Sequence, residues 1–459
     1  AASAFAIHAE IPAETQAAVA KGSTQVTLGG QLRIRGFFQN NTDFNDERAD
    51  QSATWETGAW LRMNAKVTKN TEGQITLRDS KTSGDDDMTW GGTDGYATGN
   101  DSQGNYQKGG EPRGTVTFLE AWIQHKGSGL LGIPAGFKIG HMPLRLGEGL
   151  FYSHTKNGDD ALLLFADPTK ELHLALGTVK LSEGQAASSG TTTTGNDDAD
   201  LYFLLFNYKS GKDSSISGDV ALLRDKRLGI GSDGDPALVI AEKGMDLRNL
   251  GLRANTKIAG LGIKAGGEIQ SGKAETTSTG DIKYKGYAYK VGLDYALAPV
   301  TVGLEYAYGS GDENRTDLSY KGFITILDNT QKSSWVAEYR TVTPAVASAA
   351  GTATTSQTGL NNMQYIKATI GSKLAKDLTG RLDFYYLKAN KVGSFTYKEK
   401  DMGWEIDPYI EYQIDKNLKY FVEGGYLFAG DFYKNAANVS AGKSPDDAYA
   451  IRHGLVLSF

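Results

Sequence analysis

The sequence predicts an all-β fold, a transmembrane, antiparallel, up-and-down β-barrel of about 18 strands. Three observations lead to this prediction. Apolar and polar residues alternate along most of the chain, and short connections alternate with long polar ones. In addition, no run of about 18 apolar residues is available for a membrane-spanning helix. We divide the chain into an N-terminal segment, residues 1–23, and a barrel, residues 24–459.

The alternation is clear in residues 25–38, QVTLGGQLRIRGFF. One face of this stretch carries Val26, Leu28, Leu32, Ile34 and Phe38, and the other carries Thr27, Gln31, Arg33 and Arg35. Successive side chains of a strand point to opposite faces, so this period predicts a strand with one apolar face. The same reasoning gives 18 strands, with approximate spans 24–39, 54–68, 73–80, 115–126, 136–142, 159–166, 171–181, 200–209, 214–225, 246–258, 262–271, 282–296, 300–310, 362–372, 380–389, 401–414, 417–429 and 448–459.

The connections between these strands alternate in length. Short ones, such as residues 69–72 and 167–170, alternate with long polar ones, such as residues 81–114 and 311–361. In an antiparallel meander this order places all the short turns at one end. We therefore expect short periplasmic turns and long extracellular loops.

A large soluble β-protein, such as a sandwich or a propeller, is the competing interpretation. Two features favour a membrane barrel instead. Charges recur on the face opposite the apolar one, strand after strand, and the apolar faces carry aromatic residues near strand ends. These aromatic residues include Tyr287, Tyr289, Tyr295, Tyr306, Tyr308 and Tyr426.

The N-terminal segment begins with small and apolar residues, AASAFAIHAEIPAE. It fits either the tail of a secretory signal peptide or part of the mature chain, and both remain open. Residues 12–21 predict a short helix, with Pro12 at its start and Gly22 just past its end.

The last residues, YAIRHGLVLSF, resemble the C-terminal strand of bacterial outer-membrane proteins, which ends in an aromatic residue. The resemblance implies recognition by the barrel-assembly machinery through Phe459 and a location in the bacterial outer membrane. His453 departs from the apolar parity of that pattern. The simpler interpretation is an outward-facing strand that closes the barrel against the first strand.

The pattern of the whole chain resembles porins of roughly eighteen strands. A local stretch, FLEAWIQHKG followed by GFKIGHMPLRLGEGLFYSHTKNGDDALLLF, is similar to the alginate-export family of outer-membrane channels. The matching residues are Glu120, Ala121, Trp122, Arg145, Gly147, Gly149 and Asp160. The resemblance implies a channel, and it does not identify alginate as the solute.

If the apolar faces contact lipid, parity places many charged residues in the lumen. The basic ones come from the first three strands and the last strand, which closes beside the first. We call this set, Arg33, Arg35, Arg62, Arg78 and Arg452, the basic ladder. The acidic ones nearby are Glu405, Glu411 and Glu423. Opposed basic and acidic walls would produce a transverse electric field that orients ions and dipolar solutes in the lumen. The alternative is that these charges merely pair with each other across strands and stabilise the wall.

Residues 143–158, PLRLGEGLFYSHTKNG, are less polar than the other long connections. We expect this segment to fold into the barrel and form part of a constriction, with Arg145 and Glu148 near the path. The alternative is an ordinary outer loop packed over the rim.

Other functional classes find little support. The chain has no Cys, which excludes disulfides and thiolate metal sites, and its net charge of −6 argues against nucleic-acid binding. Acidic clusters at residues 85–87 and 197–200 lack the spacing of an EF-hand loop, and we expect no metal and no cofactor. Ser153 and His154 are sequence neighbours, which point to opposite faces of a strand, and no catalytic constellation is predicted.

The sequence thus predicts an outer-membrane channel for passive diffusion of small hydrophilic solutes, anions among them. Its expected partners are membrane lipid, these solutes and the assembly machinery. The alternative function is a barrel component of an export or electron-conduit assembly that encloses a partner protein. A rim enzyme is a third hypothesis, and the oligomeric state is left open.

Overall fold

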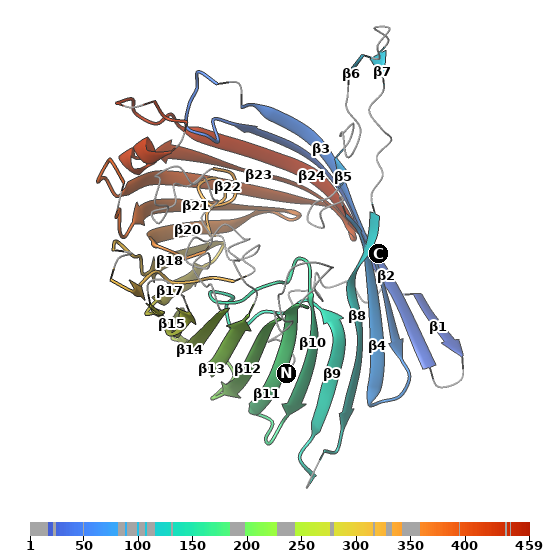
Figure 1. Ribbon diagram of the computed structural model, residues 1–459. Coiled ribbons are helices and arrows are strands. Elements are labelled where there is room, and N and C mark those ends of the chain that lie inside the picture. Colours follow the sequence, from blue (N-terminus) through green and yellow to red (C-terminus); the bar gives the residue numbers. More distant parts are fainter. Residues whose placement is uncertain are drawn as a thin grey trace.

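The computed structural model describes most of the barrel and parts of the long connections (Figure 1). The described residues are 17–21, 24–48, 50–80, 88–89, 99–100, 106–107, 115–129, 132–183, 198–226, 244–275, 280–314, 317–326, 333–341, 359–393, 395–436, 438–440 and 442–459.

Eighteen antiparallel strands form a closed ring, and they correspond in order to the 18 predicted spans. They are β2 (Thr24–Asn40), β3 (Ser52–Lys66), β4 (Thr71–Ser80), β8 (Thr115–Gly127), β9 (Ala135–Met142), β10 (Asp159–Ala166), β11 (Leu172–Ser182), β12 (Ala199–Lys209), β13 (Ser215–Asp225), β14 (Gly244–Ile258), β15 (Leu261–Glu275), β17 (Tyr287–Leu297), β18 (Val300–Gly309), β20 (Met363–Ala375), β21 (Leu378–Ala389), β22 (Asp401–Asp415), β23 (Leu418–Ala429) and β24 (Ala448–Ser458). The ring closes where β24 pairs with β2, with Leu457 opposite Leu32.

The apolar face of each strand lies on the outside of the ring. On β2, for example, Leu32 and Ile34 are 43% and 37% exposed. Arg35, on the opposite face of the same strand, is 7% exposed. A soluble protein would bury such residues, so exposure of this kind on strand after strand marks a surface that contacts lipid. The predicted transmembrane β-barrel is confirmed.

One bulge changes the parity within a strand. The pairing of β4 with β8 shifts between Thr76 and Leu77, and Leu119 is the extra residue. Phe118 is therefore 58% exposed on the outer face, while Glu120 is 1% exposed on the inner face, although both numbers are even.

The helix predicted for residues 12–21 is wrong over its second half. Residues 17–21 form strand β1 (Ala17–Lys21), which pairs with the start of β2, Ala17 opposite Leu28. The reason is an unpaired edge, because β24 reaches only to Gln31 and leaves the first residues of β2 without a neighbour on that side. Residues 12–16 lie outside the described residues.

The predicted strand 282–296 is divided in two. Strand β16 (Ile282–Tyr284) pairs with β15 and with β19 (Ser319–Tyr320), and β17 begins at Tyr287. The remaining described elements are β5 (Met88–Thr89), β6 (Gly99–Asn100), β7 (Tyr106–Gln107) and the 3₁₀ helix η3 (Asp431–Asn435). In the described part of the chain, no helix has the length and apolar character needed to cross a membrane.

Candidate functional site: a constricted lumen

Residues 143–158, which we call the crossing segment, connect β9 to β10 and span the lumen. At one side, Arg78 of β4 donates hydrogen bonds to the Lys156 carbonyl and, at 3.1 Å, to Asn157 Oδ1. At the other side, the Lys290 ammonium of β17 lies 3.1 Å from the Glu148 carboxylate. Strands β4 and β17 are the third and twelfth of the eighteen in the ring, so they lie on opposite walls.

The two charged residues predicted for a constriction both lie on this segment. Glu148 pairs with Lys290, as described, and Arg145 is bridged through its backbone to Ser153. Burial lowers the pKa of Arg145, which also feels Glu148 and the Arg253 guanidinium of β14. Gly147 has a positive φ of +54°, and a side chain there would overlap the Arg253 guanidinium, so the approach to this wall requires glycine.

A second segment, residues 321–326, packs against the crossing segment. The Ile326 N–H donates to the Phe151 carbonyl at 2.8 Å, and the Thr325 hydroxyl donates to the Leu150 carbonyl at 3.0 Å. Phe151 is fully buried, and so are Tyr152, Phe323 and Ile324. A packed apolar core therefore occupies the part of the lumen beside β9–β15.

A helical turn, residues 333–341, lies against the opposite part of the wall, and we call it the capped turn. The Glu405 carboxylate of β22 accepts hydrogen bonds from the Val336 and Ala337 N–H groups at 2.6 and 2.8 Å. Asp407 accepts one from the Trp335 N–H at 3.1 Å. Free N–H groups at the start of a helical turn favour carboxylates, which explains the attachment.

This attachment determines the environment of Glu405. The sequence assigned it to an acidic pore wall, but its side chain is fully buried beneath the capped turn. Its negative charge is therefore neutralised by peptide dipoles and is not presented to the lumen.

The capped turn brings one further cation, Arg340, to the inner wall. Its guanidinium lies 4.3 Å from the Phe37 ring and 4.9 Å from the Trp335 ring. Within the described residues, no carboxylate lies within 4.0 Å of it. Burial and the neighbouring Arg452 lower the pKa of Arg340 to about 10, which leaves it charged at neutral pH.

The basic ladder is paired across strands at most positions. Arg35 contacts Glu56 at 2.8 Å, and Arg62 lies 3.9 Å from Glu120. Arg452 pairs with Glu423 of the adjacent β23, and Arg78 binds the crossing segment. The Arg33 guanidinium lies 4.7 Å from the Trp60 ring.

Glu411 is placed away from this group, toward the short-turn end of β22. It accepts hydrogen bonds from the Lys419 ammonium at 2.9 Å and the Tyr409 hydroxyl at 2.6 Å. The three predicted acidic residues therefore have separate tasks: Glu405 holds the capped turn, Glu411 pairs with Lys419, and Glu423 pairs with Arg452.

The sequence interpretation missed Arg340, Trp335 and the role of Asp407. Residues 311–361 were expected to be an outer loop, and strand periodicity says nothing about such a segment. One signal was present: Trp335, Val336 and Ala337 form an apolar group within that connection, which is typical of a packed segment.

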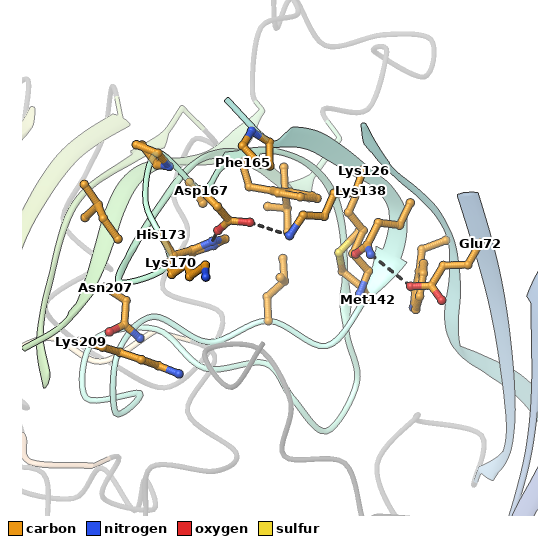
Figure 2. A pocket seen from close by; sticks show the side chains of 18 of the residues that line it. Glu72, Lys126, Lys138, Met142, Phe165, Asp167, Lys170, His173, Asn207 and Lys209 are labelled. Carbon is orange, nitrogen blue, oxygen red and sulfur yellow. Dashed lines mark hydrogen bonds and ion pairs between the residues drawn. The ribbon is translucent and has the colours of Figure 1, made fainter. Parts of the chain in front are cut away.

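Below the crossing segment, toward the short turns, the inner wall is hollowed into a vestibule of about 900 Å³ (Figure 2). Its floor is apolar and includes Leu163 and Phe165, and Lys138 lies over the Trp122 ring at 3.8 Å. At its edge, Asp167 binds both the Lys126 ammonium at 2.6 Å and His173 Nδ1 at 2.7 Å.

The described residues contain no group of three or more His, Asp or Glu side chains placed to hold a metal ion. Residues 85–87 and 197 of the acidic clusters lie outside the described residues, while Asp198 and Asp200 pair with Lys180. His154, the neighbour of Ser153, has its Nδ1 atom 2.9 Å from the Asp159 carboxylate.

Comparison with known proteins agrees with this architecture. OccAB1 of Acinetobacter baumannii is similar with a TM-score of 0.58 and 10% identity, over 95% of this chain and 96% of that chain. OccAB4 of the same species gives 0.53 and 11%, over 95% and 98%. OprD of Pseudomonas aeruginosa gives 0.52 and 13%, over 95% of both chains. At these identities the similarity shows the fold alone.

The closed ring of eighteen strands with an apolar outer face defines the class, a porin-type β-barrel of the bacterial outer membrane. A family model described as alginate export matches residues 24–446. The chain belongs to the alginate export family, as the local resemblance predicted. No curated protein matches the chain.

Proposed function

We propose that the protein is a passive outer-membrane channel for small hydrophilic solutes and that it prefers anions. The observation that carries the proposal is Arg340, a cation without a carboxylate partner among the described residues, held at the inner wall by the capped turn. The charged groups that act on it are two ion pairs, Arg35 with Glu56 and Arg452 with Glu423, whose charges balance, so the charge of Arg340 itself supplies the net positive potential at this point.

Further support comes from the sign of the neighbouring charges. Burial of Glu405 removes one negative charge from the wall, whereas the basic ladder lies on the strands on either side of the barrel closure. The family description, alginate export, names a polysaccharide whose sugars carry carboxylates, and this is consistent in sign with a cationic path.

The alternative function, a barrel that encloses a partner protein, needs a wide and open lumen. The crossing segment and the capped turn occupy the inner space instead. The crossing segment is fixed to the wall by the Lys290–Glu148 pair, and the capped turn by buried hydrogen bonds to Glu405. We therefore place the diffusion channel first.

We also propose that Phe459 serves as the recognition residue for barrel assembly. Its backbone pairs with Gly30 in both directions, at 2.7 and 3.0 Å, and its ring covers Gly30 on the outer face. This arrangement places an aromatic ring on the outer face, beside the strands that close the barrel.

Single-channel recording of the purified protein in a planar bilayer, with reversal potential in a salt gradient, tests the function. We expect steady open steps and an anion preference. A cation preference would keep the channel but contradict the role of Arg340 and the basic ladder. Absence of conductance from folded protein would overturn the channel and favour the enclosed-partner alternative.

A further inference from the structure

The outer surface of the barrel has two different halves at its extracellular rim. Over β17–β24 and β2–β3 the rim is aromatic, with stacked pairs such as Tyr287–Tyr308 at 5.8 Å and Tyr426–Tyr449 at 6.0 Å between ring centroids. Aromatic rings at this level are typical of a membrane interface. Over β9–β16 the same level is charged.

The charged half is a row of directly opposed residues, one per strand, from β9 to β16. In order these are His141, Asp160, Lys180, Asp200, Arg224, Asp246, Lys273 and Lys283. All share the face of the exposed apolar residues, so the row lies outside the barrel. Several members pair along it, for example Lys180 with Asp200 at 2.9 Å and Arg224 with Asp246 at 3.2 Å.

Three cations at one end of this row have no carboxylate within 4.0 Å among the described residues: Arg248, Lys283 and Lys285. All three are exposed. Arg248 lies opposite Ser271, two residues closer to the membrane than Asp246 and Lys273, which is about 7 Å along the strands.

The same place contains a hollow, because the sheet opens there. Pairing of β15 with β17 ends at Ile269 and Tyr287, and pairing with β16 begins at Lys273 and Lys283. Strand β16 turns toward β19, with the Lys285 N–H donating to the Tyr320 carbonyl at 2.8 Å.

The resulting pocket has a volume of about 490 Å³. Its lining includes Ile269, Ser271, Lys283, Lys285 and Tyr287. Lysines therefore border its extracellular side, and Ile269 and Tyr287 continue into the lipid-facing surface.

We infer that this pocket binds one membrane lipid through the phosphate of its headgroup. Arg248, Lys283 and Lys285 supply the positive charge, and lysine and arginine stems reach the headgroup level from such positions. The acyl chains lie along Ile269 and Tyr287, which a soluble phosphate cannot use. The inference is independent of the channel function, because the pocket is on the lipid-facing surface.

Native mass spectrometry of the full-length protein in a neutral detergent tests the inference. The probes are dioleoylphosphatidic acid and dioleoylglycerol, which differ only in the phosphate. We expect one phosphatidic acid bound per chain, about tenfold more tightly than dioleoylglycerol. The double variant Lys283→Gln/Lys285→Gln should lose this difference and keep its channel conductance unchanged.

The matched control is Lys373→Gln/Lys376→Gln, which removes two exposed lysines at the short-turn end. It should bind phosphatidic acid as the unmodified protein does. Equal binding of both lipids, no effect of the Lys283 and Lys285 changes, or an equal loss in the control would each overturn the inference. Displacement of phosphatidic acid by an equal concentration of glycerol 3-phosphate would also overturn it, since the site would then bind free phosphate.

Discussion

Arg340 differs from most of the charged residues near it, because its guanidinium contacts aromatic rings instead of a carboxylate. Its guanidinium stacks near Phe37 and Trp335, and contacts of this kind contribute about 0.5–2 kcal/mol each. Neither contact involves a carboxylate, so the guanidinium keeps its capacity to bind a planar oxyanion. Most members of the basic ladder, by contrast, already bind carboxylates.

We predict that Arg340→Gln lowers the anion-over-cation permeability ratio about tenfold, because a unit charge about 6 Å from a hydrated path changes the energies of an anion and a cation by roughly 0.7 kcal/mol each, in opposite directions. Reversal potentials in a salt gradient measure the ratio. Arg381→Gln is the matched control, since that guanidinium already pairs with Asp383 at 3.1 Å. An equal loss in both variants would contradict a special role of Arg340.

Glu405 is the second decisive residue. We predict that Glu405→Gln loosens the capped turn, because one of the two carboxylate oxygens that accept from the Val336 and Ala337 N–H groups becomes an NH2 donor. The expected result is more open-channel current noise and more brief closures. Glu399→Gln, at an exposed position, removes the same charge. It should show the same current noise and frequency of closures as the unmodified protein. Quiet recordings from Glu405→Gln would show that the turn does not depend on this contact.

At the scale of elements, the crossing segment is a connection that two opposite walls fix in place. Its two ends continue into β9 and β10. Lys290 contacts its middle at Glu148, and Arg78 contacts it near its end at Lys156. The apolar residues Leu146 and Phe151 pack with residues 321–326 instead of facing water. The segment therefore behaves as part of the core and should not move as a free loop.

We predict that replacing residues 145–151 by Gly-Ser-Gly raises single-channel conductance at least about twofold, since the narrow part of a channel limits its current. Gel mobility before and after boiling checks that the barrel still folds. An unchanged conductance from a folded variant would mean that ions pass elsewhere, between the crossing segment and the capped turn.

At the scale of the whole molecule, the outer face is a lipid-contacting surface with a defined height. On β14 this face runs from Asp246 at the charged row, past Leu250 and Leu252, to Ile258 near the short turns. The exposure of these residues has a physical explanation only if hydrocarbon surrounds the ring.

We predict that Leu252→Arg, in the middle of this face, lowers the free energy of unfolding by about 2–4 kcal/mol. Tyr202 lies on the same face, two residues from Asp200 of the charged row, and Tyr202→Arg should cost about 0–1 kcal/mol. Guanidinium unfolding in phospholipid vesicles measures both. Equal costs would show that the apolar band does not end where the charged row begins.

How far the sequence could predict the molecule differs between elements. Strand order and the outward faces followed from alternation, which depends only on the geometry of a strand. The bulge at Leu119 and the break before Tyr287 did not follow, because each depends on the neighbouring strand. Strand β1 was misread as a helix because its pairing partner, the free edge of β2, is a property of the assembled sheet.

The sequence by itself determined the barrel, its orientation and its family, because each strand carries its own apolar period and each connection its own length. Only the tertiary structure decided which charged side chains lack an ion-pair partner and can interact with a solute in the lumen. Arg35, Arg62 and Arg452 have acidic partners, Glu405 is buried by the capped turn, and Arg340 comes from a connection that showed no period. A charge acts through its surroundings, and those surroundings come from residues that lie far apart in the chain.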